Sequence, residues 1–186
     1  MENLERKTVA ILATNGFEES ELSSPKKALE EAGANVHIVS LESGEIKGWK
    51  DGNWSNTYKV DKTVNEVTHN DYHALMLPGG VINPDTLRTN EKAVQFIRSF
   101  FDVHKPVAAI CHAPILLAEA DVLEGRKITS YNSIKTDLIN AGAIWKDEEV
   151  VVDAGLVTSR TPKDLPAFNA KLVEEVYEGK HKEQTV

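Results

Sequence analysis

Short apolar runs alternate along the chain with segments in which apolar residues recur at helical spacing. Buried parallel strands read as continuous apolar runs, and the helices that connect them read as amphipathic segments. The alternation therefore predicts an α/β fold with a mostly parallel central sheet and helices on both of its faces. We expect strands at residues 8–14, 35–40, 74–80, 106–110 and 127–130, and helices at residues 23–34, 90–103, 113–123, 133–143 and 162–179.

The first of these helices carries signals for both of its ends. Ser24 is a candidate cap, Pro25 suits the first helical position, and Gly33 stands where a left-handed residue closes many helices. These signals predict a helix that begins just after Ser24 and ends before Gly33.

Three segments depart from the alternation. Residues 43–60 contain glycines, an Asp-Gly pair and two tryptophans, which predicts a hairpin or excursion at the sheet edge, packed by Trp49 and Trp54. Residues 149–159 predict a second hairpin that turns at Asp153-Ala154-Gly155. The polar tail, residues 180–186, is expected to fray.

Composition and charge exclude several classes of protein. The 186 residues suit one domain, 1–186, with the 41% hydrophobic and 27% charged residues of an ordinary globular protein. A net charge of −8 with no cluster of Lys and Arg argues against a nucleic-acid surface. No apolar stretch approaches the roughly 18 residues of a membrane span, and the N-terminus lacks the order of a secretory signal. We therefore expect a cytoplasmic protein with no membrane contact.

Cysteine and histidine counts limit the covalent and metal chemistry. The single cysteine cannot form an internal disulfide. The six histidines have neither a second thiol nor the His-x-x-x-His spacing of common zinc sites, so we expect no structural metal.

The single cysteine, Cys111, lies in "VAAICHAPILL", where a predicted strand passes into a predicted helix. In a nucleophile elbow, small residues two positions before and after the nucleophile let strand and helix approach closely, and Ala109 and Ala113 hold those positions. Pro114 suits a helix that begins just after the cysteine. The dipole of that helix should lower the thiol pKa. The alternative is a buried cysteine that acts only as a small hydrophobic residue.

Two neighbouring features are candidates for assisting Cys111. His112 follows it directly, although adjacent residues do not generally face each other, so His112 either pairs with the thiol through the elbow backbone or only caps a helix or reaches solvent. In "LPGG", Gly79 and Gly80 follow a strand and are candidates to aim backbone N–H groups at an oxyanion beside Cys111. A Gly-Gly pair is otherwise simply a turn.

The motifs "NGFEESEL", "LPGG" and "AICHAP", with "KITSYNSIKTDLINAGA" and "VVVDAGLVTSRTP" downstream, resemble the PfpI-type intracellular proteases of the parkinsonism-associated deglycase superfamily, which is class I glutamine-amidotransferase-like. The resemblance runs from about residue 8 to residue 175. It implies a flavodoxin-like three-layer sandwich with Cys111 as the nucleophile. It also implies that Glu18 is a protonated carboxyl that donates to the sulfur, with Glu19 and Glu21 as the alternatives in neighbouring registers.

In the resembled family a neighbouring subunit supplies a carboxylate to the histidine after the cysteine. The matching segment here is "VINPDTLR", which puts Asp85 in that position, although the family archetype has a glutamate at a spacing one residue shorter. Asp85 either completes a Cys111-His112-Asp85 triad across subunits or caps the helix that follows. The first alternative implies a homodimer at least, and a hexamer as the larger assembly.

The resemblance implies cofactor-free cysteine chemistry on methylglyoxal, glyoxal or their adducts on amino groups, through a hemithioacetal at Cys111 in a deglycase or glutathione-independent glyoxalase. Glu18 and His112 would shuttle the protons. Peptide hydrolysis through a thioester is the first alternative. A thiol redox sensor is another, and a flavodoxin-like binding module has little support because no Gly-x-Gly-x-x-Gly or Walker motif is present.

Overall fold

A seven-stranded sheet forms the centre of the protein in a computed structural model that describes residues 2–184. The strand order is β10-β11-β7-β6-β1-β2-β5, and every pairing is parallel except that of β10 with β11. The strands are β1 (Thr8–Leu12), β2 (Asn35–Ser40), β5 (Lys62–Thr63), β6 (Ala74–Leu77), β7 (Val107–Ile110), β10 (Val150–Asp153) and β11 (Leu156–Ser159).

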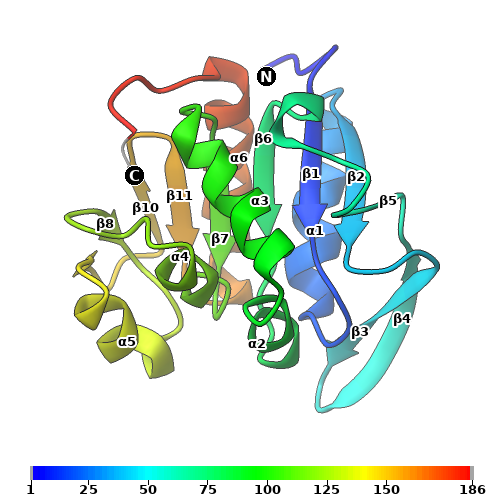
Figure 1. Ribbon diagram of the computed structural model, residues 1–186, viewed down its shortest axis with the longest axis horizontal. Coiled ribbons are helices and arrows are strands. Elements are labelled where there is room, and N and C mark those ends of the chain that lie inside the picture. The colour runs from blue at the N-terminus through cyan, green and yellow to red at the C-terminus, as the bar shows by residue number, and fades with distance from the viewer. Residues whose placement is uncertain (1, 185–186) are drawn as a thin grey trace.

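Helices cover both faces of this sheet (Figure 1). One face carries α1 (Glu19–Glu31) and α6 (Leu165–Glu178), and the other carries α2 (Ile82–Leu87), α3 (Glu91–Asp102), α4 (Ile115–Glu119) and α5 (Lys135–Asn140). Strand β1 shows the period-two alternation that two covered faces require: Val9 and Ile11 belong to the core under α1 and α6, whereas Ala10 and Leu12 belong to the core under α3 and α4. The predicted three-layer α/β sandwich is confirmed.

The hairpin expected within residues 43–60 is formed by β3 (Glu45–Lys50) and β4 (Asn53–Lys59), which make a separate antiparallel sheet. Trp49 and Trp54 pack edge to face with ring centroids 5.2 Å apart, so the tryptophans do pack the insert. Its base is tied to the loop after β1, because Gly16 N donates to Lys47 O at 2.8 Å and Trp49 N donates to Phe17 O at 2.7 Å. A second small sheet pairs β8 (Lys127–Ile128) with β9 (Ile144–Trp145).

The start of α1 differs from the sequence prediction. The helix begins at Glu19, so Ser24 is not its cap and Pro25 lies inside it, where proline leaves one backbone carbonyl without its helical partner. The Ser24 hydroxyl instead accepts from Asn169 Nδ2 at 2.8 Å and joins α1 to α6. At the other end, Gly33 has φ +100° just beyond the helix, as predicted.

The C-terminal tail is more ordered than its polar sequence suggests. His181 N donates to His104 O at 3.0 Å, and the Gln184 side chain is fully buried. The expectation that the tail frays is therefore wrong for residues 180–184, and residues 185–186 lie outside the described part of the chain.

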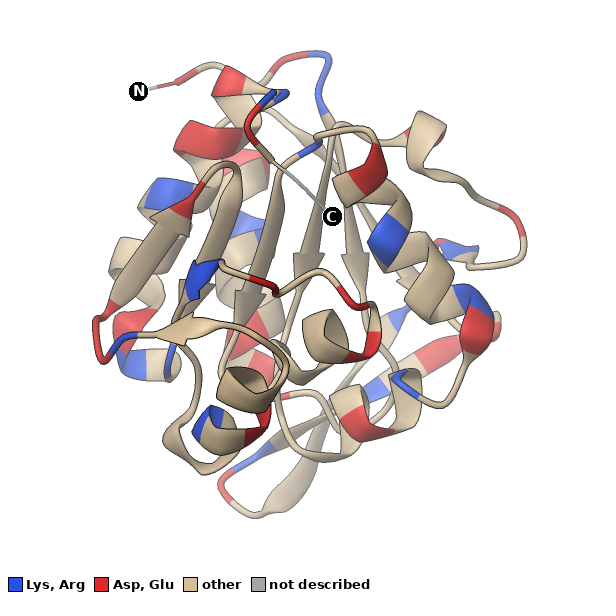
Figure 2. Ribbon diagram, turned by 60° about the vertical axis from the view of Figure 1, so that its left-hand side comes forward, with Lys and Arg blue, Asp and Glu red and all other residues tan. Residues whose placement is uncertain are grey.

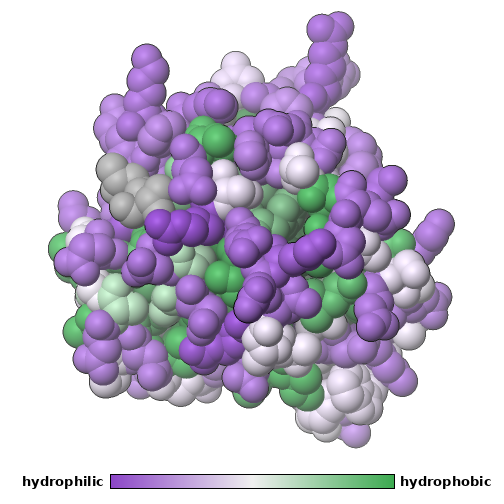
Figure 3. All heavy atoms as spheres, in the orientation of Figure 1, coloured by the Kyte–Doolittle hydropathy of each residue, from purple (hydrophilic) through white to green (hydrophobic). Residues whose placement is uncertain are grey.

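Charged residues of both signs are interspersed over the surface (Figure 2). The face seen in Figure 3 is largely hydrophilic, with small and separate hydrophobic patches. Within residues 2–184, no helix combines the length and the apolar character that a bilayer crossing requires.

Candidate active site

Cys111 lies at a sharp turn between β7 and α4, at the carboxyl end of the parallel strands. Its φ of +64° is a left-handed conformation that side-chain-bearing residues rarely adopt. Two backbone bonds fix the turn: Cys111 N donates to Ser159 O at 3.0 Å, and Tyr131 N donates to Cys111 O at 2.8 Å. Cys111 is 7% exposed, and the strained turn that carries it has the form of the predicted nucleophile elbow.

The strained backbone brings the adjacent His112 side chain onto the thiol. Its Nδ1 lies 3.2 Å from Cys111 Sγ, and its Nε2 lies 3.1 Å from the Ser133 hydroxyl. Its ring stacks on Tyr131 with centroids 4.6 Å apart. Burial lowers the pKa of His112, which favours the neutral imidazole. A neutral ring that donates from Nε2 to Ser133 leaves Nδ1 free to accept the thiol proton.

Glu21, rather than Glu18, is the carboxyl beside Cys111. It is fully buried on the first turn of α1, and its Oε2 accepts from Gly79 N at 2.9 Å. Its Oε1 is buried and has no hydrogen bond of good geometry within residues 2–184, and the neighbouring thiol is the next hydrogen-bonding group. Burial raises the pKa of Glu21 to about 8, so the carboxyl keeps its proton at neutral pH.

The assignment of this role to Glu18 is therefore corrected. Glu18 precedes the helix in an extended conformation, is half-buried, and accepts from the Ser20 hydroxyl at 3.1 Å. Glu18 lies just before α1, which begins at Glu19. Glu21 lies three residues further along the chain, on the buried face of the helix that also carries Leu22, Pro25 and Leu29.

The expectation that a helix dipole lowers the thiol pKa is also wrong for this site. Burial raises the pKa of the Cys111 thiol, and negative charge on Glu21 raises it further, whereas backbone N–H groups of His112 and Gly80 lower it. Helix α4 begins only at Ile115, so its N-terminus does not adjoin the sulfur. A proton on Glu21 removes the repulsion and supplies a hydrogen-bond donor to the sulfur.

The two glycines of "LPGG" both lie beside the Glu21 carboxyl. Gly79 N–H donates to Glu21 Oε2 at 2.9 Å, whereas Gly80 N–H is within reach of both the Glu21 carboxyl and the sulfur of Cys111. A Cβ on Gly79 would lie 2.5 Å from Glu21 Oε2 and 2.8 Å from Cys111 Cβ. The role of Gly80 N–H as a donor to an oxyanion stays a prediction, and Gly79 N–H holds the Glu21 carboxyl in place.

Gly80→Ala is expected to destabilise the protein strongly. Gly80 has φ +79°, and an added Cβ would lie 2.7 Å from the backbone nitrogen of Glu18. Left-handed strain and overpacking together predict a loss of about 2–5 kcal/mol. The melting temperature of Gly80→Ala should therefore lie roughly 5–15 °C below that of the wild type.

Gly52→Ala is the matched control for this change. Gly52 has nearly the same φ, +78°, at the hairpin tip, and an added Cβ meets nothing within 4 Å. Only the strain of about 1–2 kcal/mol remains there. If Gly80→Ala and Gly52→Ala lowered the melting temperature equally, the close packing of backbone atoms around Gly80 would not be the reason for a glycine there.

Asp85 lies away from His112 within one chain. It is exposed on the short helix α2, and within residues 2–184 its side chain has no hydrogen bond or ion pair. His112 Nε2 is occupied by Ser133, which the sequence analysis did not identify, as it did not identify Tyr131. Both follow β8 in "SYNS", where Asn132–Ile134 form a 3₁₀ helix, and the predicted helix over residues 133–143 did not indicate what its first turn contacts.

The site occupies the place where α/β sheets commonly bind ligands. Glu21 follows β1, Gly80 follows β6 and Cys111 follows β7, at the carboxyl ends of three adjacent strands. In the sheet β2 lies on one side of β1 and β6 on the other, so the order of the strands reverses at β1, and α/β sheets commonly bind ligands at such a point.

Comparison with known proteins identifies the family. The model of the DJ-1/PfpI family matches residues 7–175. The chain belongs to the DJ-1/PfpI family. The predicted resemblance is thereby confirmed.

Individual relatives match most of the chain. “Putative cysteine protease YraA” of Bacillus subtilis is 48% identical over 163 residues, 88% of this chain and 94% of the relative. “Protein/nucleic acid deglycase 2” of Escherichia coli is 48% identical over 164 residues, with the same coverage of the two chains, 88% and 94%. A two-domain structure from Anabaena variabilis, with DJ-1/ThiJ/PfpI-like and ferritin-like domains, superposes with a TM-score of 0.86 at 36% identity. This chain is 91% covered in that superposition and spans 48% of the two-domain protein.

Proposed function

We propose that this member of the DJ-1/PfpI family is a cysteine-dependent enzyme that acts on methylglyoxal, glyoxal or their adducts on amino groups. The observation that carries the proposal is the approach of His112 Nδ1 to Cys111 Sγ at 3.2 Å, beside the buried carboxyl of Glu21. A nucleophile, a neutral base and a retained proton are the three groups that this chemistry needs. The deglycase name of the Escherichia coli relative supports the same class of substrate.

The first chemical step is addition of the sulfur to an aldehyde carbon. As the carbon–sulfur bond forms, His112 Nδ1 takes the thiol proton, and the aldehyde oxygen becomes the hydroxyl of a hemithioacetal by gaining a proton. The Glu21 carboxyl is the nearby source of that proton, and Gly80 N–H donates a hydrogen bond to the oxygen while its charge develops.

The second step is a proton shift within the bound carbon skeleton. For methylglyoxal, a base removes the hydrogen from the former aldehyde carbon, and a proton returns to the adjacent carbon, which leaves a lactyl thioester. Water then cleaves the thioester to lactate and restores the thiol, so that methylglyoxal and water become lactate. With a hemiaminal adduct, the sulfur bonds to the carbon that carries the amine as the carbon–nitrogen bond breaks, and the amine leaves with the proton taken from the thiol. The hemithioacetal that results then follows the same steps to lactate.

Peptide hydrolysis is the alternative function, supported by the name of the Bacillus subtilis relative. It uses the same nucleophile and base, but the leaving group is an amine from a peptide bond. Exposed Val81 and Ile82, 64% and 41% exposed directly after Gly80, support a homo-oligomer in which a second copy covers this rim. The role of Asp85 across such an interface stays a prediction.

Product analysis of the full chain tests the proposal. Lactate release from methylglyoxal without glutathione should be measured alongside hydrolysis of a labelled peptide by the same preparation. We expect lactate and no peptide cleavage. Peptide cleavage without lactate would instead establish the alternative, and absence of both products would overturn both functions.

A further inference from the structure

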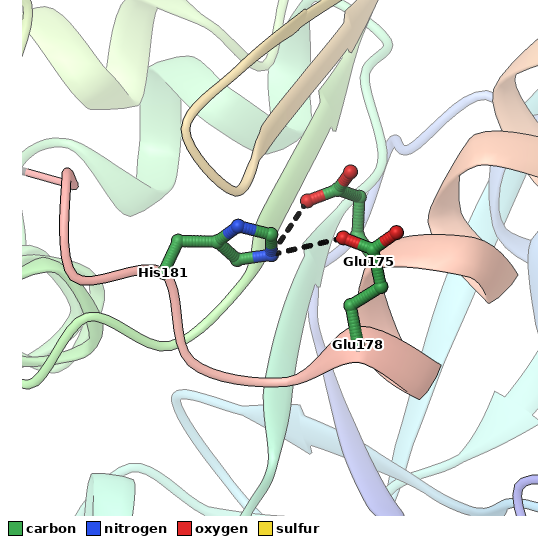
Figure 4. Close-up of side chains that lie close together, drawn as sticks. All are labelled: Glu175, Glu178 and His181. Atoms are coloured by element: carbon green, nitrogen blue, oxygen red, sulfur yellow. Dashed lines mark ion pairs between the residues drawn. The ribbon is translucent and has the colours of Figure 1, made fainter.

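A second group of ionisable side chains gathers at the end of α6, away from Cys111. Glu175 and Glu178 project from the last turn of the helix, and Gly179, with φ +86°, turns the chain so that His181 returns toward them (Figure 4). His181 Nε2 lies 2.8 Å from Glu175 Oε2 and 3.9 Å from Glu178 Oε2. One ligand atom from each of the three lies within 4.8 Å of the others.

The inner atoms of this group are buried without hydrogen bonds. The Glu175 side chain is 7% exposed. Its Oε2 and the Nε2 of His181 are both enclosed, and neither makes a hydrogen bond of good geometry to any residue from 2 to 184, in spite of their short separation. The two atoms form a buried ion pair when His181 is protonated, and when His181 is neutral its Nε2 and Glu175 Oε2 both have lone pairs available for a cation.

The charges around this point favour a cation. Two carboxylates stand on the last turn of α6, where the helix dipole is negative and no basic residue is present. Lys171, the nearest lysine on the helix, is paired with Glu174 at 2.7 Å. A positive ion between the three side chains would offset the negative charge of the two carboxylates and of the helix end.

We propose that Glu175, Glu178 and His181 bind a divalent transition-metal ion of the Zn²⁺ class. One imidazole nitrogen and two carboxylate oxygens form a ligand set typical of such ions, and three protein ligands leave a position for water. The expectation of no structural metal rested on the absence of a second thiol and of His-x-x-x-His spacing. The three proposed ligands instead follow a Glu-x-x-Glu-x-x-His pattern at the end of α6.

The ion would fasten the C-terminal tail to the fold. The His181 ring packs directly on Gly155, where an added Cβ would lie 2.8 Å from Cδ2 of the ring. Gly155 precedes β11, whereas Ser159, at the other end of that strand, bonds Cys111. The metal site is therefore at the opposite end of the sheet from the thiol, and its proposed role is to join α6, the tail and the β10–β11 turn.

Zinc titration of the tag-free full chain tests this proposal. The chain carries Cys111→Ser so that the thiol cannot bind the metal, and it is treated with chelator and dialysed before ZnCl₂ is added in a calorimeter. We expect one binding site. Loss of a ligand in Glu178→Gln or His181→Asn should weaken binding at least about 100-fold, no less than loss of an outer-shell partner does.

Glu174→Gln is the matched control, because it removes the same charge from the same helix outside the cluster, and we expect it to keep the affinity of its parent. Zinc should also raise the melting temperature of the parent and the control but not of the ligand variants. Equal zinc affinity in all the variants, or no binding by the parent, would overturn the proposal. Glu178 is half-exposed, so Glu178→Gln decides the question if His181→Asn does not fold.

Discussion

Cys111→Ala is expected to reduce lactate formation from methylglyoxal to the uncatalysed background while the fold persists. The thiol is the only group in the proposed mechanism that forms a bond to carbon, so no neighbouring side chain replaces it. We expect a fall in kcat/KM of at least about 10⁴-fold, the scale seen when a nucleophile is removed from a cooperating site. Lactate assays and far-ultraviolet circular dichroism on the same preparation check both parts of the prediction.

Cys111→Ser is the companion variant, because it keeps the shape of the side chain and a hydrogen-bonding group beside His112. Its hydroxyl is a far weaker nucleophile, so it should be as inactive as alanine. Substantial lactate formation by either variant would mean that the 3.2 Å pair of Cys111 and His112 is not where the chemistry occurs.

Glu21→Gln is expected to lower activity by about 10²–10⁴-fold, the contribution of a positioned proton donor. Glutamine keeps an acceptor for Gly79 N–H and a donor for the sulfur, but it cannot transfer a proton. Steady-state kinetics on methylglyoxal measure this loss, which should lie mainly in kcat.

The same variant should be more stable than the wild type at pH 7. The pKa of Glu21 is about 8 in the folded protein and 4.5 in its reference state, so between these values the unfolded chain loses its proton first. The stability of the wild type therefore falls as pH rises from about 4.5 to about 8, whereas the uncharged amide of the variant carries no such dependence. Melting curves should separate the two proteins at pH 7 and converge below pH 4.

Activity should depend on pH through the same ionisation of Glu21. Wild-type activity should fall above the Glu21 pKa of about 8, because a charged carboxyl repels the thiolate. The residual activity of Glu21→Gln should lack this alkaline fall. Glu18→Gln is the control, because within residues 2–184 its carboxyl accepts a hydrogen bond only from Ser20, and it should leave rate and stability nearly unchanged. The alkaline fall should remain but move to lower pH, because the charge of Glu18 helps to raise the pKa of Glu21. A larger loss in Glu18→Gln than in Glu21→Gln would return the acid role to Glu18.

The sequence predicts those parts of the structure that depend on local pattern. The apolar run 106–110, followed by Cys111 and a proline, is sufficient for the elbow, because only a sharp turn passes directly from strand to helix. The hairpin is likewise predicted by its Asp-Gly pair. These features are set by residues that are neighbours in the chain.

The position of the acid is not set by local pattern alone. Ser24 and Pro25 are strong helix-start signals, so the sequence predicts that the helix begins there. The helix in fact begins at Glu19, because Leu22 and Leu29 bury one of its faces against the sheet. Glu21 lies four residues before Pro25 and eight before Leu29, so continuing the four-residue spacing of that buried face upstream would have pointed to Glu21. Tertiary packing outweighs the capping preference here, since a cap contributes only about 1 kcal/mol.

Side chains brought together by long-range contacts were the hardest to predict. Ser133 reaches His112 from the start of the predicted helix 133–143, and the tail is held by His104 through a backbone bond across the fold. Neither pairing has a counterpart in hydrophobic periodicity, because both depend on where the loops at the ends of the sheet meet.

The hairpin of β3 and β4 is bonded to the rest of the fold at its base and free at its tip. Its base bonds the loop that leads into α1, and so holds the start of the helix that carries Glu21. At its tip, Asp51 and Gly52 are exposed, and nothing packs near Gly52. Residues added at this tip would therefore lengthen the hairpin without moving the start of α1, so the chain can tolerate insertions there while Glu21 keeps its position.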